Sequence, residues 1–364
     1  MENNPLYLHC FNLIPNFGPN RLFKLCEYFE SFKKAFVANK QELTICGIES
    51  EIIENFFNLK NSLNLEKESQ KLNSLGISLL SYKDPLYPKL LLEIPKYPSL
   101  LYYRGKLPKI DELCIATVGT RKITTYGKLA TPQIVENLSL HGATIVSGLA
   151  YGVDALCHQS ALLVGKRTVA VLAGGIDDKS LYPQNHCLLA KQILDLDGML
   201  ISEYPPKTPA LKHHFVARNR IISGMSVATI VIECSLDSGS LITAKYALEQ
   251  NRNVYAVPGP IYAEQSKGPN NLIKMGARLI TSAEDILEDL NMQNLPKEQE
   301  VQSLFGNSPD ENIILKTLKF EPQTINEIIK QSGLSTANAT SALTFLEMKG
   351  KVRNLGGQQY TLSR

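Results

Sequence analysis

The sequence predicts an α/β fold, in which a doubly wound, mostly parallel sheet follows an N-terminal helical domain and precedes a C-terminal winged-helix domain. From about residue 65 to 290, short apolar segments alternate with stretches of helical periodicity, which is typical of a parallel sheet with helices on both faces. Residues 1–64 show only helical spacing of apolar and aromatic side chains. Residues 311–364 have the order helix, helix, helix and hairpin.

Composition limits the class of protein. A chain of 364 residues has room for two or three domains, and its hydrophobic fraction of 44% and charged fraction of 20% are ordinary for a globular protein. The formal net charge of +3 is too small to imply polyanion binding by itself, so any basic surface must be local.

Cysteine usage and the chain start indicate the compartment. The seven cysteines include no Cys-x-x-Cys pair, which argues against structural zinc and against a disulfide framework. The sequence starts without a signal-peptide pattern and has no apolar run of membrane-spanning length. We therefore expect a cytoplasmic protein with no bound metal and no membrane association.

The first 64 residues are expected to form a helical domain of the SAM or helix-hairpin-helix type. Leu6–Phe11 and Leu22–Phe29 have helical apolar spacing, and a turn with Pro and Gly separates them. Such a hairpin can present backbone N–H groups to a phosphate. Because Asn16 stands where these hairpins usually have Gly, the sequence favours a packing role.

The central domain, residues 65–290, is expected to bind its ligand at the carboxyl ends of the strands, as parallel sheets do. Four loops rich in Gly and Ser follow predicted strands, and their convergence on one edge is a stronger signal than any single loop. The loops are Gly119-Thr120-Arg121, Ser147-Gly148-Leu149-Ala150, Gly174-Gly175 and Ser238-Gly239-Ser240. The predicted strands are Leu113–Val118, Thr144–Val146, Thr168–Leu172, Met199–Ser202, Thr229–Glu233, Val254–Val257 and Arg278–Thr281. The predicted helices are Tyr126–His141, Asp154–Val164, Gln184–Leu196 and Leu241–Asn251.

Residues 291–310 are polar, without a clear period, and predict a linker. In the winged-helix domain, residues 311–364, the helix Ile325–Gln331 precedes a turn and the helix Thr336–Lys349. Gly356-Gly357 then separates two short strands. The basic residues Lys349, Lys351 and Arg353 are weak evidence for DNA contact, because Glu347 is adjacent. This domain could bind a protein, duplex DNA or neither.

The loop Gly119-Thr120-Arg121 leaves a strand and enters a helix. Gly lets a phosphate approach the backbone, Thr120 can donate its hydroxyl, and Arg121 can form two parallel hydrogen bonds to an anion. The alternative is a tight turn with a solvated Arg121. The chain lacks both Gly-x-Gly-x-x-Gly after the first strand and Gly-x-x-x-x-Gly-Lys-Ser/Thr, so dinucleotide binding and P-loop ATPase activity are disfavoured and no cofactor is expected.

The second loop contains Ser147-Gly148 and Ala150 and leads into a helix with Asp154 and His158. The i,i+4 spacing places these two side chains on one helix face, where His158 could be a general base oriented by Asp154. We favour the simpler interpretation, in which Asp154 caps the helix and His158 is a packed, hydrogen-bonded residue.

Leu211–Arg220 is interpreted as a cationic turn that bears one aromatic side chain. A basic run of this kind is commonly only a solvated face. Phe215 among the charges favours a function, because an aromatic ring and guanidinium groups together bind bases and phosphates of single strands. Arg220 could instead pair with a buried acid such as Glu233. The loop Ser238-Gly239-Ser240 opens a helix and predicts a phosphate site or a simple N-cap, or both.

Together these blocks resemble the bacterial DNA-processing protein A family (DprA, also called Smf) over nearly the whole chain. The resemblance rests on Gly119-Thr120-Arg121, on Ser147-Gly148-Leu149-Ala150, on Phe215 with Arg218-Asn219-Arg220, on Ser238-Gly239-Ser240 and on Val257-Pro258-Gly259. It implies an extended Rossmann-like domain that binds single-stranded DNA. The family protects incoming DNA in natural transformation, loads the RecA recombinase, works as a homodimer and is not known as an enzyme.

Carried over block by block, the resemblance also implies which residues contact DNA. These are Gly119, Thr120, Arg121, Ser147, Gly148, Ala150, Lys212, Phe215, Arg218, Asn219, Ser238, Gly239 and Ser240, with Arg252 as a weaker addition.

Two alternatives remain open from the sequence. Phosphoribohydrolases of nucleoside monophosphates share a Rossmann-like core, and Glu203 or Glu233 could assist such a reaction, although their Pro-Gly-Gly-x-Gly-Thr loop is missing here. A transcriptional regulator that uses the winged helix ranks last, because the chain shows no effector-sensing domain.

Overall fold

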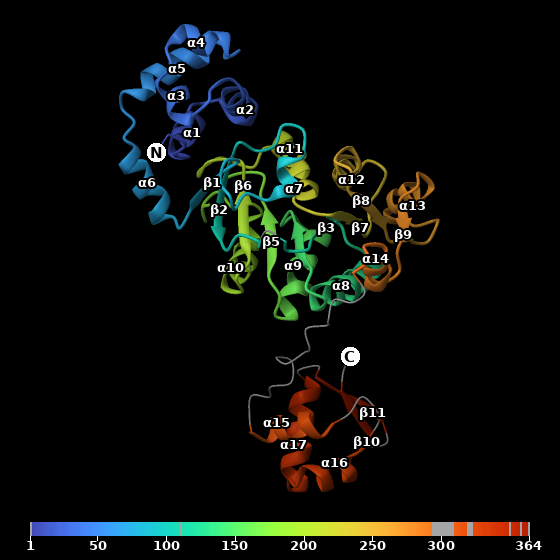
Figure 1. The fold of residues 1–364 in the computed structure, drawn as a ribbon. Coiled ribbons are helices and arrows are strands. Elements are labelled where there is room, and N and C mark those ends of the chain that lie inside the picture. Colours follow the sequence, from blue (N-terminus) through green and yellow to red (C-terminus); the bar gives the residue numbers. More distant parts are fainter. Residues whose placement is uncertain are drawn as a thin grey trace. The chain divides into compact units, whose positions relative to one another are not determined.

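The computed structural model describes residues 2–109, 111–292, 309–318, 323–348, 351–356 and 359–362. The chain forms two compact units, residues 1–297 and residues 298–364 (Figure 1). None of the helices in the described part of the chain combines the length and the apolar character needed to cross a bilayer.

The first unit begins with the expected helical domain. Its core is aromatic: Phe11 and Phe56 stack with ring centroids 4.5 Å apart, and Phe17 packs beside them. Asn16 has a φ of 62°, so it adopts the left-handed conformation that asparagine tolerates better than most residues. The helices are α1 (Leu6–Asn12), α2 (Gly18–Tyr28), α3 (Phe32–Val37), α4 (Lys40–Ile45) and α5 (Ser50–Lys60). The next helix, α6 (Leu65–Ser74), lies beyond the boundary expected at residue 64 and precedes the first strand.

A buried polar contact joins this helical domain to the sheet. The hydroxyl of Tyr102, on the strand β2 (Leu100–Gly105), lies 2.9 Å from Nδ1 of His9 and accepts a 3.3 Å hydrogen bond from the side-chain amide of Asn12. Tyr102 and His9 are at most 1% exposed. The first helix is therefore fixed to the sheet by its side chains as well as by the chain connection.

The sheet of the first unit has the order β1-β2-β6-β5-β4-β3-β7-β8-β9. The strands from β3 to β9 run parallel to their neighbours, and β2 is antiparallel to both β1 and β6. This confirms the mostly parallel sheet and adds β1 and β2, which were not predicted from the sequence; of the nine strands, β2 alone runs against the others. The strands are β1 (Ser78–Ser81), β2 (Leu100–Gly105), β3 (Cys114–Val118), β4 (Thr144–Ser147), β5 (Thr168–Val171), β6 (Met199–Ser202), β7 (Ala228–Val231), β8 (Asn253–Ala256) and β9 (Arg278–Leu279).

Helices cover both faces of the sheet (Figure 1). Buried side chains of β3, β4 and β7, such as Ile115, Ile145 and Ile230, pack on one face against α8 and α9, and those of the other face pack against α11 and α12. On the first face lie α8 (Thr125–Leu140), α9 (Val153–Leu163), α10 (Cys187–Asp195) and α14 (Ala283–Asp289). On the second lie α7 (Lys89–Leu92), α11 (Lys212–Gly224), α12 (Gly239–Glu249) and α13 (Lys267–Lys274).

The chain reverses its direction of winding at β3. From β3 it passes through α8 to β4 on one side, whereas β7 pairs with β3 on the other side. The loops that leave β3 and β4 therefore turn to one side and the loop that leaves β7 to the other. Together they border one crevice at the carboxyl ends of these strands. A crevice at such a switch point is the usual ligand position in a doubly wound sheet.

The cationic turn expected at Leu211–Arg220 is wrong, because Leu211 is the N-cap of the helix α11 and the residues that follow it lie within this helix. The residues that α11 buries at helical spacing include the polar side chains His214, Arg218 and Asn219 next to Ile221 and Ile222. Polar side chains are usually exposed, so apolar periodicity does not reveal a helix whose buried face is polar in its first half.

The second unit has the expected winged-helix order. Ile314, Leu343 and Leu346 are fully buried in its core, Thr324 and Glu327 form a capping box, and Gly333 ends α16 with a φ of 69°. Lys349, Gly357 and most of the predicted linker lie outside the described residues. Its elements are α15 (Pro309–Thr317), β10 (Gln323–Thr324), α16 (Ile325–Ser332), α17 (Thr336–Met348), β11 (Val352–Gly356) and β12 (Gln359–Leu362), with the strand order β10-β12-β11.

Candidate functional site

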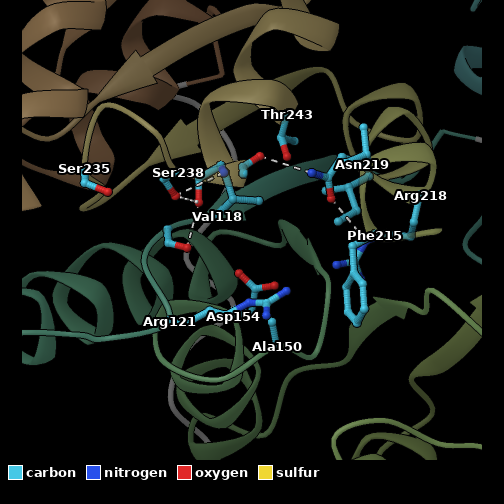
Figure 2. Close-up of a pocket in the computed structure, with 15 residues that line it drawn as sticks. Val118, Arg121, Ala150, Asp154, Phe215, Arg218, Asn219, Ser235, Ser238 and Thr243 are labelled. Carbon is cyan, nitrogen blue, oxygen red and sulfur yellow. Dashed lines mark hydrogen bonds between the residues drawn. The ribbon is translucent and has the colours of Figure 1, made fainter. Parts of the chain in front are cut away.

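A pocket of about 310 Å³ lies in the crevice at the carboxyl ends of β3, β4 and β7. Four segments converge on it: the loops after these three strands and one side of α11 (Figure 2). Its lining residues are Val118, Gly119, Arg121, Ala150, Asp154, Phe215, Val216, Arg218, Asn219, Ile222, Ser235, Ser238, Gly239, Ser240 and Thr243.

The loop after β3 is held tightly against its neighbours. A Cβ on Gly119 would lie 2.5 Å from the side chain of Val153, so only glycine fits there. The amide of Thr120 donates a 2.6 Å hydrogen bond to the main-chain oxygen of Glu233, and the Thr120 hydroxyl accepts from the amide of Lys122 at 3.1 Å. The buried Thr120 therefore shapes the turn, and the exposed Arg121 extends from it.

Arg121 and Phe215 meet at one end of the pocket. The guanidinium carbon of Arg121 lies 5.0 Å from the centroid of the Phe215 ring, and that of Arg218 lies 5.9 Å from it. Figure 2 shows this ring at the end of the pocket away from Ser238. No ion pair within the described part of the chain involves Arg121. Its charge is therefore available to an anion that enters the pocket.

Arg218 is only 4% exposed and forms part of the pocket wall. Its Nη1 donates to the main-chain oxygens of Gly148, at 2.7 Å, and of Val171, and its Nε donates to Oδ1 of Asn219 at 3.2 Å. Burial lowers the pKa of Arg218 to about 10, against the opposing effect of the Asp154 carboxylate. The guanidinium is thus still charged at neutral pH, and its hydrogen bonds to carbonyl oxygens offset part of the cost of burial.

Asp154 is the acid of the pocket, and it too is buried. Its Oδ2 accepts a 3.2 Å hydrogen bond from the amide of Gly148. Burial raises the pKa of Asp154, and the charge of Arg218 opposes that rise. Asp154 and Arg218 are both buried and of opposite charge, so the exposed Arg121 dominates the charge that a ligand meets.

The loop after β7 places the start of α12 at the pocket. Ser238 caps this helix by accepting from the amide of Ser240 at 3.3 Å, and the Ser240 hydroxyl donates to the main-chain oxygen of Gly119 at 2.7 Å. The side-chain amide of Asn219 donates to the main-chain oxygen of Gly239 at 3.1 Å. A Cβ on Gly239 would meet no atom within 4 Å, so the backbone here is open to a ligand.

The structure brings together nine of the residues expected from the sequence. These are Gly119, Arg121, Ala150, Phe215, Arg218, Asn219, Ser238, Gly239 and Ser240. Three others stand behind the wall: Thr120, Gly148 and Ser147, whose buried hydroxyl donates to the main-chain oxygen of Thr117 at 2.7 Å. Lys212 is exposed at the first position of α11, outside the pocket.

The expectation for Arg252 needs correction, because this residue lies at the opposite edge of the sheet. Arg252 immediately precedes β8, at the amino end of that strand. Its Nη2 donates to the main-chain oxygen of Leu90 at 2.9 Å and to the Glu93 carboxylate at 2.8 Å, and its side chain is 9% exposed. Arg252 therefore ties α7 to the sheet, far from the carboxyl-end crevice.

Several lining residues were not expected. Val118 and Ile222 are apolar residues at the end of β3 and within α11, and Ser235 and Thr243 flank the Ser238 loop. Ser235 follows β7 in the same loop as Ser238, so its position in the sequence was a usable signal. The apolar residues gave no such signal, because they resemble ordinary core residues.

The acids and His158 serve structural contacts. Nδ1 of His158 lies 2.8 Å from the Thr168 hydroxyl, and burial lowers the pKa of His158 to about 3, so His158 is packed as expected. The expectation that Asp154 caps the helix is wrong, because Gly152 is the N-cap of α9 and no side chain caps it, and Asp154 binds the Gly148 amide instead. Arg220 pairs with Glu203, at 2.6 Å, rather than with Glu233 as suggested. Glu233 accepts hydrogen bonds from the amide and the hydroxyl of Thr124. In the described residues, no three His, Cys, Asp or Glu side chains are grouped so that they could hold a metal ion.

Comparisons with known proteins agree with this arrangement. A family model described as DNA recombination-mediator protein A matches residues 78–291, which include the whole sheet and every loop of the pocket. A second model, described as DprA winged helix domain, matches residues 297–358.

Individual relatives cover most of the chain. Protein Smf of Synechocystis is 34% identical over 395 aligned positions, which cover 97% of this chain and 98% of that protein. The crystal structure of DNA processing protein A from Streptococcus pneumoniae has a TM-score of 0.69 at 33% identity and covers 79% of this chain and 98% of that one.

A structure of DNA processing protein A from Helicobacter pylori, described as giving insight into a unique single-stranded DNA binding mode, has a TM-score of 0.53 at 30% identity and covers 59% of this chain and 95% of that one. The fold, the loops of the pocket and the winged helix therefore all lie within matched regions. The chain belongs to the DNA recombination-mediator protein A family.

Proposed function

We propose that the protein binds single-stranded DNA, with one nucleotide in the carboxyl-end pocket and the rest of the strand along its rim. The observation that carries this proposal is the pairing of the exposed Arg121 with the ring of Phe215, opposite the open backbone of Gly239. A cation, an aromatic face and a helix N-terminus offer partners to the phosphate and the base of the same nucleotide.

The size of the pocket supports one nucleotide rather than a folded ligand. Its volume of about 310 Å³ is at the lower end of the range for ligand pockets, roughly 300–1,000 Å³. A longer strand must therefore pass over the rim, where Lys212 is exposed at the start of α11. In a duplex the bases are stacked and paired, so they cannot reach the Phe215 ring without the duplex opening.

The contacts available also predict low sequence preference. The pocket presents guanidinium groups, hydroxyl groups, main-chain N–H groups and an aromatic ring, which bind phosphate or the flat face of any base. Binding should weaken as salt rises, because each phosphate that is neutralised releases counterions.

Fluorescence anisotropy of a labelled oligothymidylate and of its duplex counterpart, at low and moderate salt, tests the proposal. We expect a salt-sensitive preference of the wild type for the single strand, and Arg121→Ala should weaken it. Lys33→Ala removes one exposed positive charge on α3, in the helical domain, and serves as the charge-matched control. Equal binding of duplex and single strand, or an unaffected Arg121→Ala variant, would reject this site.

Binding without catalysis is supported by the state of the two glutamates that a hydrolase would use. The Glu203 carboxylate is buried and accepts two hydrogen bonds from Arg220 at 2.6 Å. The Glu233 carboxylate is 2% exposed and is bound to Thr124. Release of free base from a mononucleotide, abolished by Glu233→Gln in a folded protein, would instead establish a phosphoribohydrolase.

We extend the proposal to protection of incoming DNA in natural transformation and to loading of RecA on the bound strand, by a homodimer. Family membership supports both steps. Exposed apolar side chains on the loop after β8, at the C-cap of α13 and on β9 support self-association at that end of the sheet: Ile261, Tyr262, Met275 and Leu279. Sedimentation of wild type and Met275→Asp would test the dimer, and RecA filament formation on coated DNA would test loading.

A further inference from the structure

A second group of exposed aromatic side chains stands on the same edge of the sheet as the pocket. Tyr151 is in the loop after β4, and Tyr182 is in the loop after β5, so both lie at carboxyl ends of strands. Tyr151 is 40% exposed and Tyr182 is 47% exposed. Single exposed aromatic residues need no explanation, but these two are connected to residues of the pocket.

Tyr182 is in contact with the aromatic ring of the pocket. Its ring centroid lies 5.8 Å from that of Phe215, and the two ring planes meet at 74°. This edge-to-face contact fixes the orientation of the Tyr182 ring while 47% of the residue stays exposed. A ring that is already oriented loses little conformational freedom when a base stacks on it.

Tyr151 is connected to the pocket through the chain and through His186. It directly follows Ala150, which lines the pocket. Its ring lies 4.9 Å from that of His186, at 67°, and Nδ1 of His186 lies 2.8 Å from the main-chain oxygen of Leu149. The short helix Gln184–His186 begins two residues after Tyr182. The loops after β4 and β5 thus carry two edge-to-face ring pairs, each connected to a residue of the pocket or of its loops.

We propose that Tyr182, together with Tyr151 and His186, forms a second base-stacking surface for the nucleotides adjacent to the one in the pocket. This inference rests on the proposed function and adds the direction in which the strand leaves, towards the β4 and β5 loops. The ligand is a run of consecutive unpaired bases of any sequence, because every base has a flat face that can stack.

The charges around these rings fit a nucleic-acid strand. Of the two carboxylates in the loop before Tyr182, Asp177 accepts from the amide of Lys207 at 2.7 Å, and Asp178 pairs with Arg104 at 2.6 Å. The next residue, Lys179, is exposed. A phosphate passing Tyr182 would therefore meet an exposed ammonium group beside acids that already have partners.

A fluorescence experiment tests the stacking directly. The chain contains no tryptophan, so Tyr182→Trp creates a single reporter at the proposed surface. We expect oligothymidylate to quench its emission, because a stacked base is in direct contact with the indole. Tyr28→Trp is the matched control, since Tyr28 is 48% exposed on α2, and its emission should not change. Bound DNA, seen by anisotropy, without quenching at position 182 would overturn the proposal.

A length series separates stacking from a structural role. We expect Tyr182→Ala to weaken binding of long oligothymidylates by roughly 5- to 100-fold, the loss typical of one stacked base, and to leave binding of thymidine monophosphate in the pocket nearly unchanged. If Tyr182 only supports Phe215, both ligands must lose affinity equally. Tyr182→Phe keeps the ring and should bind like the wild type.

The outcomes also distinguish this inference from the function on which it rests. A wild type that binds no single strand overturns the proposed function itself. A wild type that binds, with the same length dependence in Tyr182→Ala and in Tyr151→Ala, overturns only the second surface.

Discussion

The guanidinium of Arg218 occupies the space that a side chain at Gly148 would need. Its Nη1 donates a 2.7 Å hydrogen bond to the Gly148 main-chain oxygen, and a Cβ on Gly148 would lie 2.4 Å from that nitrogen. Arg218 belongs to α11 and Gly148 to the loop after β4, so this contact fixes the helix that carries Phe215 against the loop that carries Ala150. The wall of the pocket thus depends on a buried charge.

We predict that Gly148→Ala destabilises the fold. The added methyl group must displace the Arg218 guanidinium from two carbonyl oxygens, and overpacking of this kind costs about 1–3 kcal/mol. Urea denaturation followed by circular dichroism measures the change in the free energy of unfolding. Stability equal to the wild type would show that Arg218 can move at no cost, which would contradict its role in the wall.

Gly239→Ala is predicted to give the opposite combination, with stability retained and DNA binding weakened. A Cβ at this position meets no protein atom, and alanine has a higher helix propensity than glycine at the start of α12. The methyl group would, however, keep a phosphate from the backbone, and loss of one hydrogen bond to a charged ligand corresponds to about tenfold in affinity. Anisotropy together with thermal unfolding distinguishes the two effects. Unchanged affinity would place the phosphate elsewhere.

The sequence was sufficient to predict the convergence of the loops, because that follows from topology alone. Once strands and helices alternate, the loops after β3, β4 and β7 must meet at one edge of the sheet, and their Gly and Ser residues identify the ligand edge. Helix α11 could not be predicted in the same way, since it buries His214, Arg218 and Asn219, which are usually exposed.

The sequence also could not separate residues that face the pocket from residues that support it. Ser147 and Ser238 occupy similar Gly- and Ser-rich loops, yet Ser147 is buried and bound to Thr117, whereas Ser238 lines the pocket. From the sequence, Arg252 was expected to be a further DNA-binding cation. In the structure it lies at the amino end of β8, where it pairs with Glu93. Which way a side chain points depends on contacts between segments distant in the sequence.

The contrast between Lys212 and Arg252 gives a third prediction. Lys212→Ala should weaken the binding of all single-stranded sequences alike and reduce the slope of log affinity against log salt by about 0.7, the loss of one phosphate contact. Arg252→Ala removes the same charge at the opposite edge and should change neither affinity nor slope, although it breaks the contacts with Glu93 and Leu90 and lowers stability. A salt slope altered only in Arg252→Ala would reverse our assignment of the two edges.

The contact of His9 with Tyr102 predicts how stability depends on pH. Burial lowers the pKa of His9 from 6.5 to about 4, although Glu68 opposes the shift. The folded state therefore favours the neutral imidazole. The contribution of the neutral His9 to the free energy of unfolding is complete above pH 6.5. It is lost as the pH falls towards 4, where the loss reaches about 3 kcal/mol. His158, with a pKa of about 3, acts in the same direction.

His9→Gln isolates the part of this dependence that comes from His9. Glutamine can still bind the Tyr102 hydroxyl but cannot gain a proton, so at pH 7.5 we expect a modest loss of about 1 kcal/mol in the free energy of unfolding. Between pH 6.5 and 4 the variant should lose less stability than the wild type, because one group that must be kept neutral is gone. Urea denaturation of both proteins across this range gives the two curves. If they run parallel, protonation of His9 does not weaken the attachment of the helical domain to the sheet.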